Sequence, residues 1–197
     1  MAESPVPGRV AAGFAAAALV LQGTAGAMYS AVGGGGSGLS DDPAHMLASG
    51  ATGAALLRWG SLIDMAGYLC IAPVVVYLWH RYSQASWRDV YAAAGLALVV
   101  IGSTGAAAMA TAAPALLSDY PGANAAARQA MLPAFATLYR AVVLGMWQTL
   151  EAIPAAVWLL GTGYASRRDG PRPVTVLLVV LGLINLALAL YRLTTAT

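Results

Sequence analysis

Long apolar runs divide this chain, and they constrain its fold more than any other feature. A transmembrane helix needs about 20 consecutive, predominantly apolar residues. Runs of that length recur along the sequence, and the short segments between them hold most of the charges and turn-forming residues. The runs that we expect to be transmembrane helices are Val10–Val32, Leu56–Trp79, Val90–Leu116, Leu132–Thr162 and Val174–Leu193.

The composition supports this division. Charged residues make up 9% of the 197 residues and hydrophobic residues 59%, whereas an ordinary soluble domain has about 25% and about 45–50%. So few charges cannot cover the surface of a soluble fold, and no strongly basic run is present to bind nucleic acid. The sequence therefore predicts an all-α, polytopic membrane helix bundle of about five transmembrane helices. We expect one domain over residues 1–197 in a lipid bilayer.

The arginines predict how the helices are oriented. Cytoplasmic loops of membrane proteins carry an excess of Lys and Arg. With the expected runs as transmembrane helices, one side of the membrane holds Arg9, Arg81, Arg88, Arg167, Arg168 and Arg172. We therefore predict a protein of the inner (plasma) membrane with a cytoplasmic N-terminus and an external C-terminus. The alternative is that the first run is a signal peptide, cleaved near Ala25-Gly26-Ala27.

Several cofactor chemistries are excluded by residue type and position. The chain has no Lys, so it cannot form a retinal Schiff base or other lysine adduct. His45 and His80 lie at opposite ends of the second run, roughly 36 Å apart along a helix, so they cannot share a metal or haem. Cys70 stands among apolar neighbours, where a thiol is inert. We expect no metal and no cofactor.

Three ionisable residues fall inside the predicted helices: Asp64, Arg140 and Glu151. Each costs a few kcal/mol at the centre of a bilayer unless it is paired or wetted. Arg140 and Glu151 are separated by three α-helical turns, which leaves about 20° between their directions. Trp147 falls on the same α-helical face, with Gln148 at its edge. The fourth run is therefore expected to present one polar face to the interior of the bundle.

Depth along the helices predicts one ion pair. Asp64 and Arg140 each lie roughly 12 Å from the outer end of their runs, so we expect them to pair. That pair could serve to fix helix register or could serve the function, and the sequence leaves both open. Glu151 lies about 16 Å deeper. It is too far from Asp64 to form the carboxylate dyad of an intramembrane aspartyl protease.

Glu151 is the strongest candidate for function. It has no cationic neighbour at its depth, so it is protonated, hydrogen-bonded to Gln148 or Asn185, or open to a wet cavity. A carboxyl group in such a setting can exchange a proton near neutrality. The predicted catalytic residues are Glu151 and Asp64, and the predicted ligand-binding residues are Arg140, Trp147, Tyr68, Gln148 and Asn185. For Gln22, Tyr29, Thr104 and Thr111 we expect hydrogen bonds between helices.

These residues support a first hypothesis, in which a polar intramembrane pocket binds a lipophilic small molecule. Glu151 would act on it by acid/base chemistry, and an acid beside aromatic walls suits a prenyl or sterol-like substrate. One alternative is an accessory or assembly subunit of a larger membrane complex. Another is a small proton-coupled transporter, completed as a homo-oligomer because no inverted repeat is visible. The sequence does not decide whether the protein is an enzyme.

Two segments resemble a known family. Residues Leu57–Tyr68 (LRWGSLIDMAGY), preceded by Asp42-Pro43-Ala44, and the motif Leu138-Tyr139-Arg140 are similar to helices of uncharacterised bacterial multi-pass membrane proteins of the domain-of-unknown-function type. The resemblance covers about half of the chain by eye. It implies an all-α multi-pass fold and supplies no reaction.

Overall fold

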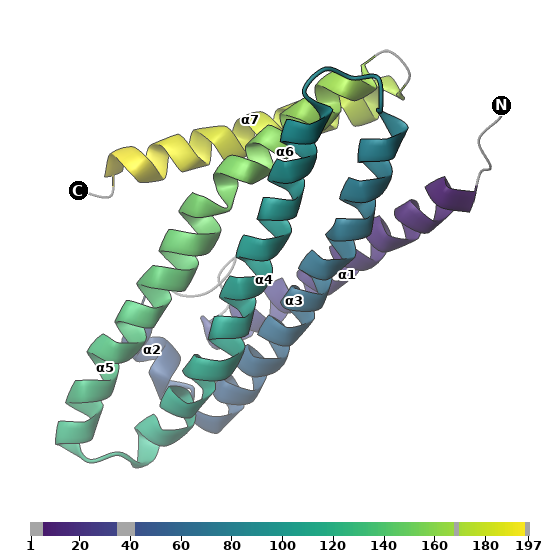
Figure 1. Ribbon diagram of the computed structural model, residues 1–197. Coiled ribbons are helices and arrows are strands. Elements are labelled where there is room, and N and C mark those ends of the chain that lie inside the picture. Colours follow the sequence, from purple (N-terminus) through teal and green to yellow (C-terminus); the bar gives the residue numbers. More distant parts are fainter. Residues whose placement is uncertain (1–5, 35–41, 168–169, 196–197) are drawn as a thin grey trace. The chain divides into compact units, whose positions relative to one another are not determined.

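The computed structural model describes residues 6–34, 42–167 and 170–195, and every regular element within these ranges is a helix (Figure 1). Arg168, one of the arginines used to predict the orientation, lies outside the described residues. The helices are α1 Val6–Val32, α2 Pro43–Ala48, α3 Gly50–Arg81, α4 Arg88–Asp119, the 3₁₀ helix η1 Tyr120–Gly122, α5 Ala125–Tyr139, the π-helix η2 Arg140–Leu150, α6 Ala152–Ser166 and α7 Arg172–Thr195.

Five helical stretches among the described residues are long and apolar enough to cross a membrane. They are Gly8–Val32, Gly50–Arg81, Arg88–Gly122, Ala125–Ser166 and Arg172–Thr194. The predicted all-α fold with about five candidate transmembrane helices is thus confirmed. The second and fourth stretches begin earlier in the chain than expected.

Polar caps explain where two helices begin. The Asp42 carboxylate accepts a hydrogen bond from the Ala44 N–H at 2.9 Å, and the side-chain oxygen Oδ1 of Asn124 accepts one from the Ala127 N–H at 2.9 Å. Such N-caps satisfy backbone donors that have no partner inside the helix. The short helix α2, which follows Asp42, lies in a segment that the sequence predicts to be a loop.

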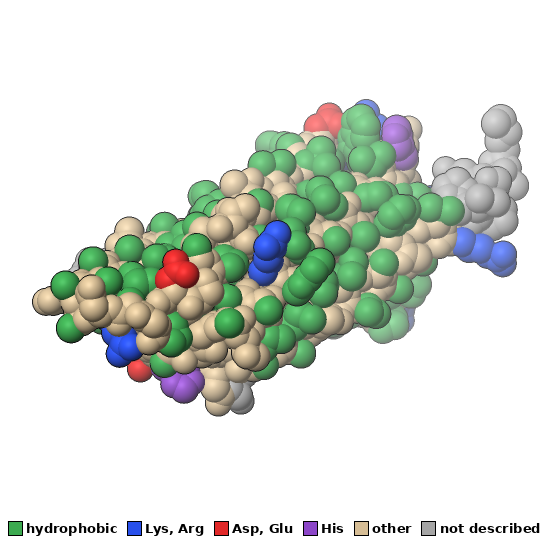
Figure 2. Space-filling model, turned by 90° about the horizontal axis from the view of Figure 1, so that it is seen from below, with side chains coloured by type: hydrophobic (Ala, Val, Ile, Leu, Met, Phe, Trp, Pro, Cys, Tyr) green, Lys and Arg blue, Asp and Glu red, His purple; other side chains and the backbone are tan. Residues whose placement is uncertain are grey.

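Apolar side chains cover much of the surface. Hydrophobic side chains are spread over the face shown in Figure 2, and charged side chains on it are few. On α7, the side chains of Val176, Leu177 and Leu190 are each more than half exposed. Exposed apolar area of this extent is unfavourable in water and favourable in lipid, as expected for a multi-pass membrane protein.

The chain forms two compact units. The first comprises Met1–Ala18, Tyr68–Gly102 and Met146–Thr197, and the second comprises Leu19–Gly67 and Ser103–Gly145. Helices α1, α3 and α4 and the π-helix η2 each contribute residues to both units. A single domain over 1–197 remains a prediction.

The second unit has a conventional apolar core. Its fully buried large side chains are Phe135, Met46, Leu47, Leu57, Met109 and Leu117. The α1 segment of this unit packs against α3 at two glycines, because Gly60 faces Tyr29 and Gly67 faces Gln22. Small residues at such positions let helix backbones approach closely.

The first unit is built around aromatic side chains. Tyr68, Leu98 and Ala155 form a buried cluster, with Ile71 and Trp158 packed against it. This cluster joins α3, α4 and α6. Helix α7 lies along α6, where Gly163 faces Val179 and Gly182 faces Leu160.

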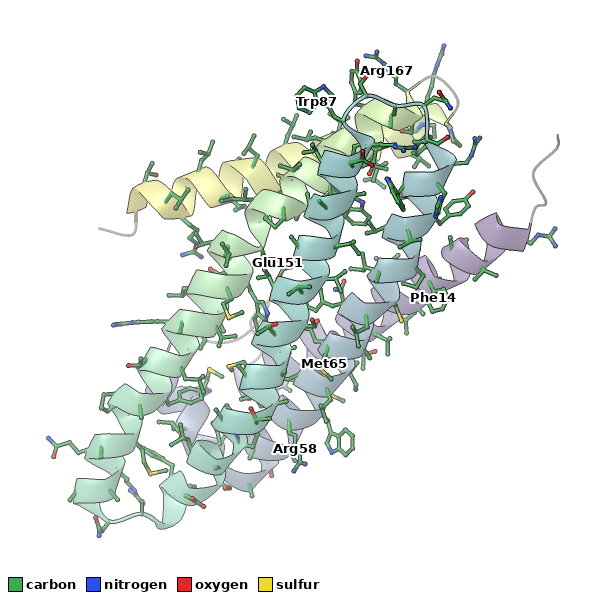
Figure 3. The ribbon with its side chains drawn as sticks, in the orientation of Figure 1. Phe14, Arg58, Met65, Trp87, Glu151 and Arg167 are labelled. Atoms are coloured by element: carbon green, nitrogen blue, oxygen red, sulfur yellow. The ribbon has the colours of Figure 1, made fainter. Side chains whose placement is uncertain are left out.

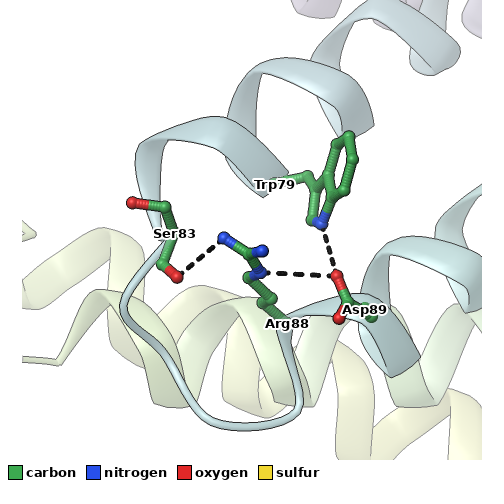
Figure 4. A network of polar contacts seen from close by, with 4 residues as sticks. All are labelled: Trp79, Ser83, Arg88 and Asp89. Carbon is green, nitrogen blue, oxygen red and sulfur yellow. Dashed lines mark hydrogen bonds and ion pairs between the residues drawn. The ribbon is translucent and has the colours of Figure 1, made fainter.

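A polar network closes the turn between α3 and α4 in the first unit (Figure 4). The Trp79 indole N–H donates to Asp89 Oδ1 at 2.7 Å, and Arg88 donates to the Ser83 carbonyl oxygen at 2.8 Å. Arg88 Nε also lies 3.4 Å from Asp89 Oδ1. Trp87 precedes α4 with φ +67°, a conformation that bulky residues rarely adopt.

Candidate functional site

Glu151, which is labelled in Figure 3, lies where the helical hydrogen-bond pattern changes. Its N–H donates to the Met146 carbonyl oxygen, five residues earlier, at 2.8 Å, whereas its own carbonyl oxygen accepts from the Ala155 N–H, four residues later, at 3.0 Å. The π-helix η2 therefore ends at Glu151 and the α-helix α6 begins directly after it. Pro154 contributes to this change, because it has no N–H to donate to the Leu150 carbonyl oxygen.

Tyr68 of α3 binds the Glu151 carboxyl group. The Tyr68 Oη donor lies 2.8 Å from Glu151 Oε1 and 2.9 Å from Oε2. The Tyr68 side chain is only 8% exposed, and Glu151 is half-buried. Two residues that the sequence assigns to the site independently are thus direct hydrogen-bond partners, in a setting where such bonds are strong.

Gly102 of α4 makes room for this pair. A Cβ atom at position 102 would overlap the Tyr68 ring, so the ring lies directly against the α4 backbone. The Trp147 indole N–H donates to the Gly102 carbonyl oxygen at 3.3 Å. Gly102 therefore holds two predicted site residues, Tyr68 and Trp147, beside Glu151.

Asp64 belongs to a separate tyrosine–carboxylate pair in the second unit. The Tyr29 hydroxyl donates to Asp64 Oδ2 at 3.3 Å and to Ser61 Oγ at 3.2 Å. Ser61 is fully buried, and Asp64 and Tyr29 are each 8% exposed. These bonds join α1 to α3, as expected for Tyr29. Asp64 and Glu151, the two carboxylates that the sequence places deep inside the helices, thus each have a tyrosine partner.

Arg140 does not pair with Asp64. Among the described residues no ion pair joins the two. The Arg140 side chain is exposed, whereas Asp64 is buried. The expected ion pair is therefore wrong. Agreement in depth did not ensure that the two side chains point toward each other.

The expected single face from Arg140 to Glu151 also rests on the wrong geometry. Its arithmetic assumes 3.6 residues per turn, but Arg140–Leu150 is a π-helix, in which each hydrogen bond spans five residues and each turn holds more of them. Trp147 and Glu151 do lie at the same site, through Gly102 and Tyr68. Arg140 is not among the residues that bind either of them.

Two other predicted site residues make no hydrogen bond to Glu151. The Asn185 amide donates to the Leu181 carbonyl oxygen on its own helix at 2.9 Å. The Gln148 Oε1 atom is buried and accepts no hydrogen bond from any described residue. Buried polar atoms rarely remain so, and Gln148 thus offers an acceptor one turn before Glu151.

A further hollow lies in the second unit, at residues that the sequence did not select. It has a volume of about 540 Å³ and is lined by Ala54, Ala55, Arg58, Trp59, Pro114, Ala115 and Ser118. None of the predicted ligand-binding residues lines it. In the sequence, the neighbouring residues Arg58 and Trp59 were the feature that could have indicated this hollow. Adjacent Arg and Trp residues also occur at ordinary membrane interfaces, so they did not select it.

No protein-family model, curated protein sequence or solved structure matches the chain. Among the described residues no group of three or more His, Cys, Asp or Glu side chains could hold a metal ion. Within the described part of the chain, five helices are long and apolar enough to cross a membrane, as in an all-α, multi-pass membrane protein, and the candidate site is a tyrosine-bound carboxyl group.

Proposed function

We propose that Glu151 takes up and releases a proton in the course of the protein's activity, which involves a lipophilic small molecule. The observation that carries this proposal is the contact of the Tyr68 hydroxyl with both oxygens of Glu151. An ionisable residue in a transmembrane segment is costly and marks a functional site by default. A phenol that can both donate and accept hydrogen bonds suits a carboxyl group whose protonation changes.

The surroundings of Glu151 support a small-molecule ligand. Glu151 is half-buried, so part of its surface is open to an approaching molecule. The buried Gln148 Oε1 acceptor one turn away would be satisfied by a ligand hydroxyl. Tyr68 and Trp147 add aromatic surface. The proposed ligand is therefore a lipophilic molecule with a hydrogen-bond donor, and acid/base chemistry on it would use Glu151 as the proton donor or acceptor.

The location of the protein is part of the same proposal. We infer a plasma (inner) membrane with the N-terminus in the cytoplasm, from the arginines Arg9, Arg81, Arg88, Arg167 and Arg172. Membership of the bacterial multi-pass family that Leu57–Tyr68 resembles is likewise a proposal.

Infrared difference spectroscopy tests the proton step. We expect a protonated-carboxyl band that changes after a pH step, is lost in Glu151→Gln and is retained in Asp64→Asn. Asp64→Asn is the matched control, because Asp64 is also buried and bound by a tyrosine. Tyr68→Phe should shift the band, because it removes the hydrogen bond. If Glu151→Gln removes no pH-dependent carboxyl band from the wild-type spectrum, the assignment is overturned.

Native mass spectrometry on gently extracted protein, with lipid analysis, tests the ligand. We expect a stoichiometric small molecule that wild type and Asp64→Asn retain and that Gln148→Leu and Glu151→Gln lose. Conversion of that molecule by wild type in vesicles would indicate an enzyme, whereas proton flux without conversion would indicate a transporter. A co-purifying polypeptide in place of the small molecule would replace this proposal with that of an accessory subunit.

A further inference from the structure

The hollow in the second unit is built from side chains of two helices. On α3 it is lined by two alanines beside Arg58 and Trp59, and on α4 by Pro114, Ala115 and Ser118. Its volume of about 540 Å³ is in the range of small-ligand sites. Most of the lining residues are Ala or Pro, whose short side chains leave the space between the helices unfilled. The hollow thus joins a small-residue apolar surface to one cationic side chain.

The Arg58 guanidinium, labelled in Figure 3, has no anionic partner in the described part of the chain. Its side chain is exposed, and it forms no hydrogen bond or ion pair with any described residue. An arginine is always charged, and within a candidate transmembrane stretch such a charge is costly unless it is paired or reaches the interface. The planar set of guanidinium donors matches the oxygens of a phosphate group.

The depth of Arg58 fits a lipid phosphate. Helix α3 has 32 residues and is roughly 48 Å long, so when centred it extends about 9 Å beyond each side of a hydrocarbon core of about 30 Å. Arg58 lies roughly 12 Å from the helix start at Gly50, which places its backbone about 3 Å inside the core boundary. An Arg side chain reaches the headgroups from there, and Trp is enriched at the same level, as Trp59 would be.

A carboxylate borders the α4 side of the hollow. The Ser118 hydroxyl donates to Asp119 Oδ1 at 3.3 Å, which holds that carboxylate beside a lining residue. Asp119 is the last residue of α4, is exposed, and makes no side-chain cap for the helix that follows. Arg128, the next cation along the chain, donates to the carbonyl oxygens of Tyr120 and Pro121. Among the described residues, Asp119 therefore has no ion-pair partner.

We propose that the hollow binds the headgroup of a phospholipid that carries both a phosphate and a primary ammonium group, as phosphatidylethanolamine does. Arg58 donates to the phosphate oxygens, the Asp119 carboxylate accepts from the ammonium N–H groups, and an acyl chain lies against Trp59 and the small apolar residues. Two opposite charges that do not pair with each other select such a headgroup. Phosphatidylglycerol has no ammonium group to offer Asp119, and phosphatidylcholine has no N–H to donate.

Native mass spectrometry of the full chain in detergent tests the choice of headgroup. The protein is offered equimolar phosphatidylethanolamine, phosphatidylcholine and phosphatidylglycerol with identical acyl chains. We expect wild type to retain phosphatidylethanolamine several-fold more than either of the others. Equal retention of the three lipids, or a preference for phosphatidylglycerol, would overturn the proposal. Inorganic phosphate in excess should leave the lipid bound, and displacement by phosphate would show a simple anion site instead.

Substitutions of the two charged residues test their separate roles. Arg58→Gln should lower the retention of phosphatidylethanolamine about tenfold, because it removes charged hydrogen bonds to the phosphate. Asp119→Asn should reduce the preference over phosphatidylcholine and phosphatidylglycerol. Arg140→Gln is the matched control, because Arg140 is also an exposed arginine in a candidate transmembrane stretch and does not line the hollow. Equal retention in Arg58→Gln and Arg140→Gln would refute the site.

The Glu151→Gln variant separates this proposal from the proposed function. Its phosphatidylethanolamine retention should equal that of wild type, because Glu151 does not line the hollow. A lipid lost from Glu151→Gln and retained by Arg58→Gln would belong to Glu151 and would overturn the present proposal alone.

Photocrosslinking locates the bound lipid. Phosphatidylethanolamine with a diazirine near the ester end of one acyl chain is added to the full chain in nanodiscs. We expect cross-links concentrated in residues 54–59 and 114–118, and their loss in Arg58→Gln. The exposed side chains of α7, such as Leu177 and Leu190, report ordinary contact with bilayer lipid. Cross-links no more frequent at the hollow than on α7 would overturn the proposal.

Discussion

Replacing Gly102 with Ala gives the most direct test of how the site is packed. The new methyl group would overlap the Tyr68 ring, which is buried and cannot move without repacking. Overpacking a close-packed interior costs about 1–3 kcal/mol. If the ring moves away, the Tyr68–Glu151 hydrogen bond is lost as well, at about 1.5–3 kcal/mol for a bond to a charged group.

A helix-propensity gain acts in the opposite direction. Ala is favoured over Gly inside a helix by about 1 kcal/mol. When the hydrogen bond is lost as well, the net expectation for Gly102→Ala is a free energy of unfolding that is roughly 1.5–5 kcal/mol lower than that of wild type. Gly13→Ala supplies the matched control, because Gly13 is also helical and exposed and a Cβ there meets no atom within 4 Å. That control should be neutral or slightly stabilised.

Equilibrium unfolding in mixed micelles with increasing sodium dodecyl sulfate, followed by circular dichroism, measures both changes. The infrared band of the Glu151 carboxyl reports separately whether Tyr68 has moved. The packing argument predicts opposite signs for the two glycines and a shifted band in Gly102→Ala alone. If Gly102→Ala unfolds at the same detergent fraction as Gly13→Ala, with the band unchanged, the Tyr68 ring does not lie on Gly102.

Four further substitutions test the other contacts by the same unfolding measurement. Tyr68→Phe should lower the free energy of unfolding by about 1.5–3 kcal/mol, and a change near zero would mean that Glu151 does not depend on this bond. Tyr29→Phe and Asp64→Asn should each lower the free energy of unfolding by about 1 kcal/mol or more. Because both remove the same hydrogen bond, the double variant should lose less stability than the sum of the two single losses. Strictly additive losses would argue against that bond. Arg140→Gln should change stability by no more than about 0.5 kcal/mol, since the side chain is exposed, and a larger loss would restore a buried role for Arg140.

The sequence predicts the helices well because their signal is local. Each candidate transmembrane stretch is an apolar run, and runs of that length have few alternatives in a helical membrane protein. The starts at Gly50 and Ala125 were missed because the residues that follow them are small or polar rather than strongly apolar. Helix α2 was missed because it is short and its main signal is a single cap, Asp42.

The site was predicted only in part because pairing between helices is not a local property. Glu151, Tyr68 and Trp147 were selected as costly or interfacial residues, and the structure brings them together. Asp64 and Arg140 were matched by depth alone, and the direction of Arg140 could not be checked against its neighbours. Apart from Pro154, no residue pattern in the sequence predicts that Arg140–Leu150 is π-helical. Nothing else in the structure explains the length of this π-helix.

The π-helix also bears on how this chain tolerates changes in length. A π-helical segment contains more residues than an α-helix needs to make the same number of turns, so η2 can lose a residue by reverting in part to α-helical hydrogen bonds. Deletion of Gly145, an exposed residue within η2, should leave a monodisperse protein in size-exclusion chromatography. Deletion of the equally exposed Val157 in α6 would instead rotate every later residue of that helix by about 100° and should abolish folding. Residues 140–150 are thus a stretch where the chain can be shortened without altering the faces of α6 that follow.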